Sequence, residues 1–186
     1  EKYIEWPFFV LNGDSYSDTD LSRFLEFHKS RSNIGSVLLS EVRDTSHYGN
    51  VSLHKGQINE FLEKQSQKTS SGLVNNGIYL FESEIFNLIP AERKVSLENE
   101  VLPELAKRGK LGGLVHTGYF MDIGRPETYD QFKKDFLKRM QSYGDITVRE
   151  AMKIIERNRT DLLFIVDESQ GFSGILNDRI IRRFLI

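Results

Sequence analysis

The 186-residue sequence predicts an α/β fold in two parts, and three observations support this. A continuous apolar run at residues 8–11 ends at a polar turn and is typical of a buried, parallel strand. Strand, helix and strand patterns follow one another within about 35 residues, as in a βαβ unit with a right-handed crossover. The pattern restarts after residues 141–145, where a polar, glycine-containing segment predicts a linker.

The first βαβ unit is predicted from apolar spacing and capping side chains. Residues 18–20 offer two aspartates as caps for a helix in which Leu21, Phe24, Leu25 and His28 recur at helical spacing. Residues 36–41 form the second predicted strand.

The rest of the first part alternates between strand and helix patterns. Ser96 precedes an acidic first turn, and Pro103 is expected to kink or divide the helix that follows. Pro126 stands at a favourable first-turn position. The predicted elements are strands at 48–53 and 58–63, a polar loop at 65–72, a strand at 73–81, a helix at 83–88 capped by Ser83, and then a helix at 96–107, a strand at 119–124 and a helix at 127–140.

The second part is a small βαββα module. We place the boundary near residue 143, which gives domains at 1–142 and 143–186. The sequence contains no internal repeat. The elements predicted in the module are a helix at 148–158, strands at 162–166 and 172–176, and a helix at 178–185.

The composition narrows the function classes. With 28% charged residues and a formal net charge of −2, the chain is globular and is not a dedicated nucleic-acid binder. It has no cysteine, and its 4 histidines show no metal-ligand spacing. No apolar run reaches the roughly 20 residues of a membrane span. These features favour a cytosolic protein without a membrane partner.

Two carboxylates follow predicted strands. Asp14 ends the first apolar strand, where α/β sheets bind ligands, and Gly13 lets a ligand approach the backbone closely. Asp122 repeats the arrangement after an aromatic strand. Such a pair can share Mg²⁺, which prefers oxygen ligands and retains waters and phosphates. An equal alternative for Asp14 alone is that it caps the following turn.

Six segments in one order resemble the sugar-phosphate nucleotidyltransferase family over about residues 3–140. They are 11–16 (LNGDSY), 48–51 (YGNV), 61–64 (FLEK), 75–81 (NNGIYLF), 96–103 (SLENEVLP) and 118–129 (GYFMDIGRPETY). They are most similar to the D-glycero-D-manno-heptose 1-phosphate guanylyltransferase branch, with mannose-1-phosphate guanylyltransferases close behind. The resemblance implies a doubly wound, Rossmann-like sheet with mixed strands at the sugar end.

The resemblance also implies roles for particular residues. Asp14 and Asp122 match the family's Mg²⁺-binding, catalytic aspartates, and the partners are a sugar 1-phosphate and a nucleoside triphosphate, expected to be GTP. The sugar phosphate is held at positions that match Gly49, Glu63, Lys64 and Asn75, with Glu98 shaping the sugar pocket. Each assignment has an alternative that stays open. Glu63 and Lys64 are otherwise a solvated strand end, and Glu98 is otherwise an ordinary acid in the first turn of a helix. His47 stands where the family commonly has arginine.

The family's Gly-rich, basic nucleotide loop has no counterpart before Phe8. This difference implies an incomplete sheet that is truncated at its N-terminus, and a chain that is inactive by itself. Its exposed strand edges favour a homo-oligomer. The alternative is a non-catalytic subunit that binds a sugar phosphate or regulates a partner.

Residues 145–186 resemble a single CBS motif, a module that commonly binds adenine nucleotides in pairs. The segments that carry this resemblance are 146–152, 163–168 and 174–183. The usual pattern near the last helix is a hydroxyl residue and, three positions later, an acid that binds the ribose. This chain has Asn177 and Ile180 at those positions, and the Ile180 side chain cannot accept a hydrogen bond. We therefore favour a packing or dimerising module, although adenylate-regulated assembly stays as a third function class.

Overall fold

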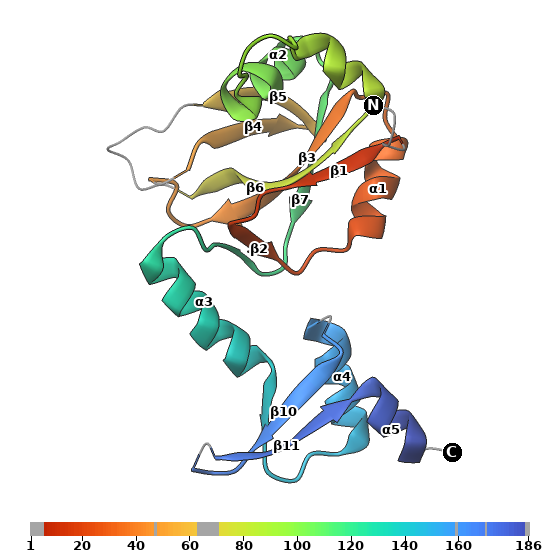
Figure 1. Cartoon of the computed structure of the whole chain (residues 1–186), viewed down its shortest axis with the longest axis vertical. Helices are drawn as coiled ribbons and strands as arrows, with labels where there is room; N and C mark the ends of the chain where they lie inside the picture. The colour runs from red at the N-terminus through yellow and green to blue at the C-terminus, as the bar shows by residue number, and fades with distance from the viewer. Residues whose placement is uncertain (1–5, 47, 63–70, 159, 170, 185–186) are drawn as a thin grey trace. The chain divides into compact units, whose positions relative to one another are not determined.

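The computed structural model describes residues 6–46, 48–62, 71–158, 160–169 and 171–184, and the chain forms two compact units, residues 1–120 and 121–186 (Figure 1). The two compact units divide at residues 120/121, before the predicted domain boundary at 142/143. A division into compact units does not test a domain boundary, so that boundary stays a prediction. None of the helices in the described ranges is long and apolar enough to cross a membrane.

A six-stranded mixed sheet in the order β1-β6-β3-β7-β5-β4 forms the centre of the first unit (Figure 1). Its only parallel pairing among the described residues joins β3 to β7. The strands of this unit are β1 (Phe8–Leu11), β2 (Ser15–Ser17), β3 (Gly35–Val42), β4 (Asn50–His54), β5 (Gln57–Leu62), β6 (Gly72–Phe81) and β7 (Leu111–His116), and β8 (Phe120–Asp122) spans the division between the units. The prediction of mixed strands is therefore confirmed.

The prediction that the first strand has a parallel neighbour is wrong. β1 pairs antiparallel with β6, from Phe8 opposite Phe81 to Leu11 opposite Ile78. The run is continuously apolar because it has two apolar faces: Phe8 and Val10 pack on one core cluster and Phe9 on another. Since β6 is also antiparallel to β3, β1 and β3 nevertheless run in the same direction.

Strand β7 was not predicted, because two glycines interrupt its apolar pattern. A Cβ at Gly113 would lie 2.6 Å from Leu53 Cδ1 and 2.9 Å from Ile58 Cγ1. A Cβ at Gly112 would collide with the Asn33 amide. The glycines therefore allow β7 to lie between β3 and β5 with close packing on both faces.

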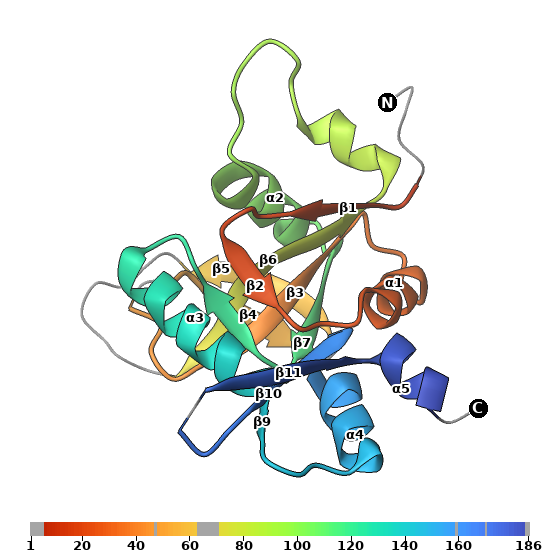
Figure 2. The same cartoon turned by 60° about the horizontal axis from the view of Figure 1, so that its bottom comes forward.

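Helices cover both faces of the sheet (Figure 2). α1 (Leu21–Lys29) packs on one face through Phe24, which contacts Leu38 and Leu80. The other face is covered by the 3-10 helix η1 (Ser83–Leu88), the π-helix η2 (Leu97–Val101) and α2 (Leu102–Lys107). Val37 and Leu39 of β3 point to this second cluster, so β3 is buried on both faces.

The predicted helix signals are largely confirmed. Asp20 caps α1 by accepting from Ser22 N at 3.0 Å and Arg23 N at 3.3 Å. Ser96 caps η2, and the helix divides where α2 begins with a proline in its first turn. The exception is Ser83, whose hydroxyl donates to the neighbouring Glu84 at 3.1 Å and makes no cap hydrogen bond.

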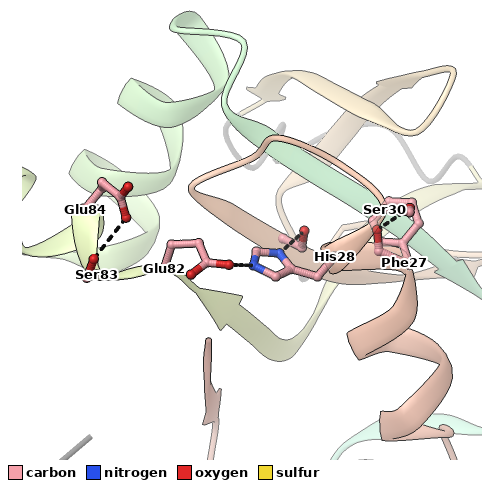
Figure 3. Close-up of polar contacts among 7 residues, drawn as sticks. Phe27, His28, Ser30, Glu82, Ser83 and Glu84 are labelled. Carbon is pink, nitrogen blue, oxygen red and sulfur yellow. Dashed lines mark hydrogen bonds and ion pairs between the residues drawn. The ribbon is translucent and has the colours of Figure 1, made fainter. Parts of the chain in front are cut away.

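A buried polar group lies where α1 ends and β3 begins (Figure 3). The His28 side chain is 1% exposed; its Nδ1 lies 2.7 Å from Ser36 Oγ, and its Nε2 lies 3.2 Å from Glu82 Oε1. Burial lowers the pKa of His28 below its ordinary value, although the nearby Glu82 carboxylate acts in the opposite direction. His28 therefore joins α1, β3 and the end of β6 in its neutral form.

The second unit packs two helices on a three-stranded sheet, order β11-β10-β9. The polar segment predicted as a linker forms β9, which pairs parallel with β10 from Gln141 opposite Phe164, so that prediction is wrong. A polar sequence suits this strand because its residues are half-buried or exposed. The elements are α3 (Pro126–Arg139), β9 (Gln141–Tyr143), α4 (Val148–Asn158), β10 (Leu162–Val166), β11 (Phe172–Asn177) and α5 (Asp178–Phe184).

From β9 onward the element order is βαββα, around a core of Ala151, Ile155, Leu163 and Ile181. Asn177 Oδ1 accepts from Ile180 N at 2.7 Å at the start of α5. In this structure Asn177 thus serves as a helix cap. The relationship to CBS motifs stays a prediction.

We expect acid to destabilise the first unit through His28. Unfolded His28 takes up a proton near its ordinary pKa of about 6.5, whereas the folded protein resists protonation. This stabilisation is present above pH 6.5 and is lost as the pH falls toward the lower folded pKa. Urea unfolding followed by the fluorescence of Trp6, the only tryptophan, should show a smaller loss of stability between pH 7.5 and 5.5 in His28→Gln than in the wild type. Equal losses would contradict the assignment.

Candidate functional site

The carboxyl ends of three strands that run in the same direction meet at one edge of the first unit's sheet. β1, β3 and β7 share this direction, and Ser40 of β3 is in register with His116 of β7. The turn at residues 12–14 follows β1 at the same edge. Ligands of open α/β sheets bind at such edges, so this is the candidate site.

Asp14 lies in this turn, between β1 and β2, and is exposed. Within the described residues its carboxylate makes no hydrogen bond, so the alternative that it caps the turn gains no support. A Cβ at Gly13 would meet nothing within 4 Å, which leaves the backbone there open to a ligand. Asp14 and Gly13 are thus accessible, as a binding role requires.

Asp122 lies in the second unit, at the end of β8, and is half-buried. Its Oδ1 accepts from Gly124 N at 2.9 Å, which fixes the carboxylate and leaves Oδ2 for another partner. The described ranges hold no group of three or more histidine and acidic side chains that could bind a metal by themselves. Two carboxylates still fit Mg²⁺, because this ion keeps waters and phosphate oxygens as its other ligands. That Asp14 and Asp122 share one ion stays a prediction.

A bulge in β6 brings amide side chains to both faces of the sheet. Val37 pairs with Tyr79 and Leu39 with Asn75, so one residue of β3 lies opposite three of β6. Within the bulge, Gly77 has φ +82°, and its carbonyl accepts from Asn12 N at 2.8 Å. The bulge therefore adjoins the turn that carries Asp14.

Asn75 and Glu98, both predicted site residues, are in direct contact. Asn75 Nδ2 donates to Glu98 Oε1 at 3.0 Å and to Tyr79 Oη at 2.8 Å, and Tyr79 Oη donates to the same Glu98 oxygen at 3.0 Å. Burial raises the pKa of the Tyr79 phenol far above its ordinary value, and the Glu98 carboxylate contributes in the same direction. Tyr79 thus stays protonated and holds Glu98, whose Oε2 makes no hydrogen bond within the described residues.

Glu98 lies in the first turn of η2 and also contacts Asn75, and its role in a sugar pocket stays a prediction. Gly49 precedes Asn50, which pairs with Val74, so backbone pairing brings Gly49 close to Asn75. Glu63, Lys64 and His47 lie outside the described residues. The structure thus brings together Gly49, Asn75 and Glu98.

Tyr79 and Asn76 make contacts at this site that the sequence did not indicate. Tyr79 lies on the same strand face as Asn75, and that spacing was the available signal. On the opposite face, Asn76 is fully buried and donates to Ser40 Oγ at 2.6 Å and to Ser17 Oγ at 3.3 Å. Nothing in the sequence indicated that these serines approach Asn76.

Residues 1–139 match the protein family described as Nucleotidyl transferase. The chain belongs to this family. Mannose-1-phosphate guanylyltransferase catalytic subunit beta of Xenopus tropicalis is 36% identical over 139 residues, which are 74% of this chain and 36% of that protein. Probable mannose-1-phosphate guanylyltransferase 3 of Arabidopsis thaliana is 34% identical over 137 residues, 73% of this chain and 41% of that protein.

Solved nucleotidyl transferase structures have the same fold. HddC from Yersinia pseudotuberculosis is 33% identical, with a TM-score of 0.61 over 73% of this chain and 58% of that one. Its complex with GMP-PN is 32% identical, with a TM-score of 0.60 and the same coverage. The chain thus spans between about a third and three fifths of the lengths of these relatives.

We predict that Gly77→Ala destabilises this nucleotidyl transferase more than Gly109→Ala does. Both glycines have positive φ, which costs an alanine about 1–2 kcal/mol. Only at Gly77 would the new Cβ also lie 3.0 Å from Asn12, whereas nothing lies within 4 Å at Gly109. Urea unfolding should give a loss of about 1–2 kcal/mol for Gly109→Ala and a larger loss for Gly77→Ala. Equal losses would show that Asn12 yields freely.

Proposed function

We propose that this chain supplies the sugar-phosphate-binding and metal-binding part of a Mg²⁺-dependent sugar-1-phosphate guanylyltransferase. In this reaction a phosphate oxygen of the sugar 1-phosphate attacks the α-phosphorus of GTP. The bond from the α-phosphorus to the bridging oxygen breaks, and pyrophosphate leaves. The observation that carries the proposal is the contact between Asn75 and Glu98 beside the Asp14 turn, in a chain that belongs to the nucleotidyl transferase family.

The sugar is bound by groups that accept hydroxyl hydrogen bonds. Glu98 Oε1 is held by Asn75 and Tyr79, so its carboxylate presents Oε2 to a ligand in a fixed orientation. Carboxylates make strong, charge-assisted hydrogen bonds with hydroxyl donors. Gly49, close to Asn75, lets the sugar phosphate approach the backbone. We also assign Glu63 and Lys64 to the sugar-phosphate site, on the basis of the family resemblance alone.

The metal is bound by Asp14 and Asp122. When bound, Mg²⁺ would neutralise the negative charge of the phosphates and align the attacking and leaving oxygens at the α-phosphorus. The protein's own contribution is to hold the two carboxylates and the sugar in position, which is the main requirement in phosphoryl transfer. Gly124 N fixes Asp122, and the turn after β1 presents Asp14.

We assign GTP and a mannose-type sugar phosphate as the substrates. Relatives that match the chain are named mannose-1-phosphate guanylyltransferases, and an HddC structure contains GMP-PN. Mannose 1-phosphate and D-glycero-D-manno-heptose 1-phosphate share the manno configuration, so both are tested.

Calorimetric titration in the presence of Mg²⁺ tests the proposal. Binding of one of these two sugar phosphates, with glucose 1-phosphate clearly weaker, would support it and identify the substrate. Release of pyrophosphate on addition of GTP would show that the chain is catalytic, whereas binding without release would favour the sugar-phosphate-binding subunit. Absence of binding to all three sugar phosphates by the folded chain would contradict the proposal.

We expect Glu98→Gln to weaken the binding of the sugar phosphate about tenfold. The substitution preserves size but replaces a charged acceptor, and hydrogen bonds to charged groups are worth about 1.5–3 kcal/mol. Glu60→Gln is the matched control, because Glu60 is an exposed carboxylate on β5. Equal affinities of both variants by titration calorimetry would remove Glu98 from the sugar site.

We expect Asp14→Asn and Asp122→Asn each to abolish the Mg²⁺-dependent part of ligand binding and any turnover. An amide retains the shape of the carboxylate but lacks the charge that binds Mg²⁺. The increase in melting temperature caused by Mg²⁺ with sugar phosphate should disappear in both variants and persist in Glu60→Gln. An undiminished increase in either aspartate variant would refute the metal assignment.

A further inference from the structure

A second histidine–carboxylate pair lies in the first unit, at the edge that carries the candidate site. His116 Nε2 is 2.9 Å from Asp18 Oδ1, and the two side chains are 12% and 9% exposed. The same nitrogen lies 3.4 Å from the Tyr119 carbonyl oxygen. The Asp18 carboxylate and the Tyr119 carbonyl are acceptors, so Nε2 is the donor in these contacts.

This pair joins two segments that are about 100 residues apart in sequence. Asp18 directly follows β2, which begins at the residue after Asp14. Tyr119 precedes Asp122 by three residues and accepts from Asp18 N at 3.1 Å. The rings of Tyr16 and Tyr119 also meet edge to face, 6.0 Å apart. β2, which follows Asp14, is thus attached to residues 116–119 of the same unit.

Gly118 makes this close approach possible. A Cβ at this position would collide with Asp18 Oδ1 and would lie 2.6 Å from His116 Cε1. The chain between His116 and Tyr119 therefore passes directly beside the Asp18 and His116 side chains, with no room for a side chain at position 118.

Asn76 of β6 attaches the end of β2 to the sheet. The Asn76 side chain is fully buried and donates to both Ser17 Oγ and Ser40 Oγ. β2 is thus attached at Ser17 to the bulge of β6 and at Asp18 to His116. By contrast, Asp14 at its other end is exposed and makes no hydrogen bond through its side chain within the described residues.

We propose that Asp18 and His116 are positioning residues that orient β2, and with it the adjoining turn that carries Asp14. This inference rests on the proposed function, because it assigns the pair to the divalent-cation site. Functional side chains need support that fixes them to within about 0.5 Å, and loss of such support weakens metal binding about 10–100-fold. The pair supplies that support through hydrogen bonds, without binding the ion itself.

The chain contains a matched control. The His28–Glu82 pair also joins a buried histidine to a carboxylate in the same unit, but it lies at the start of β3, next to Ser36 (Figure 3). Loss of either pair should lower stability. Only loss of the Asp18–His116 pair should change cation affinity.

The experiment measures Mn²⁺ affinity by electron paramagnetic resonance in the presence of mannose 1-phosphate, with hydrogen exchange of the metal-free chain. We expect His116→Ala and Asp18→Ala to raise the Kd for Mn²⁺ at least tenfold, and Glu82→Ala to leave it unchanged. His116→Gln, whose amide nitrogen can take the place of Nε2, should restore most of the affinity. The amides of residues 15–18 should exchange faster in His116→Ala than in Glu82→Ala.

Wild-type affinity in His116→Ala, equal losses in His116→Ala and His116→Gln, or unchanged exchange at residues 15–18 would each overturn the inference. The proposed function fails in a different way: the wild type would bind no Mn²⁺, or Asp14→Asn would bind it as well as the wild type does. Either of those results would remove the cation site and the positioning role with it. Faster exchange at residues 15–18 would then show a purely structural pair.

Discussion

The interruption of β6 at Gly77 is the constraint on which the rest of the first unit depends. β6 lies between β1 and β3 and pairs with both, so its conformation affects most of the sheet. Gly77 adopts a left-handed conformation, and its carbonyl binds Asn12 N at the end of β1. This hydrogen bond follows the last strand pair, Leu11 opposite Ile78, and the chain then turns at Gly13 and Asp14.

Polar groups of β6 next to the bulge lie on both faces of the sheet. Asn75 joins Tyr79 and Glu98 on the face covered by η2, whereas Asn76 joins Ser17 and Ser40 on the opposite face. Asn75 contributes to the proposed sugar site, and Asn76 supports the strand that follows Asp14. Two neighbouring residues thus connect the two proposed binding functions, because successive side chains of a strand point in opposite directions.

Local signals in the sequence predicted much of the fold, and long-range contacts limited the rest. The Asp20 and Ser96 caps and the division of the helix near Pro103 depend on neighbouring residues, and they were confirmed. Strand β7 was missed because its glycines have a packing role that becomes visible only beside β5. β9 was taken for a linker because parallel pairing with β10 depends on residues beyond the next helix. In the candidate site, family resemblance selected Asn75 and Glu98, but the Tyr79 hydroxyl that joins them required the structure.

The two histidine–carboxylate pairs lie at opposite ends of the sheet, and their positions determine what each pair contributes. His28 and Glu82 lie at the start of β3 and connect a helix to the sheet, so their hydrogen bond contributes to stability. Asp18 and His116 lie where β3 and β7 end, beside segments that lead away from the sheet. Such segments have few sheet hydrogen bonds to fix them, and side-chain contacts must supply their order. Chemically similar pairs therefore serve the fold at one end of the sheet and the orientation of Asp14 at the other.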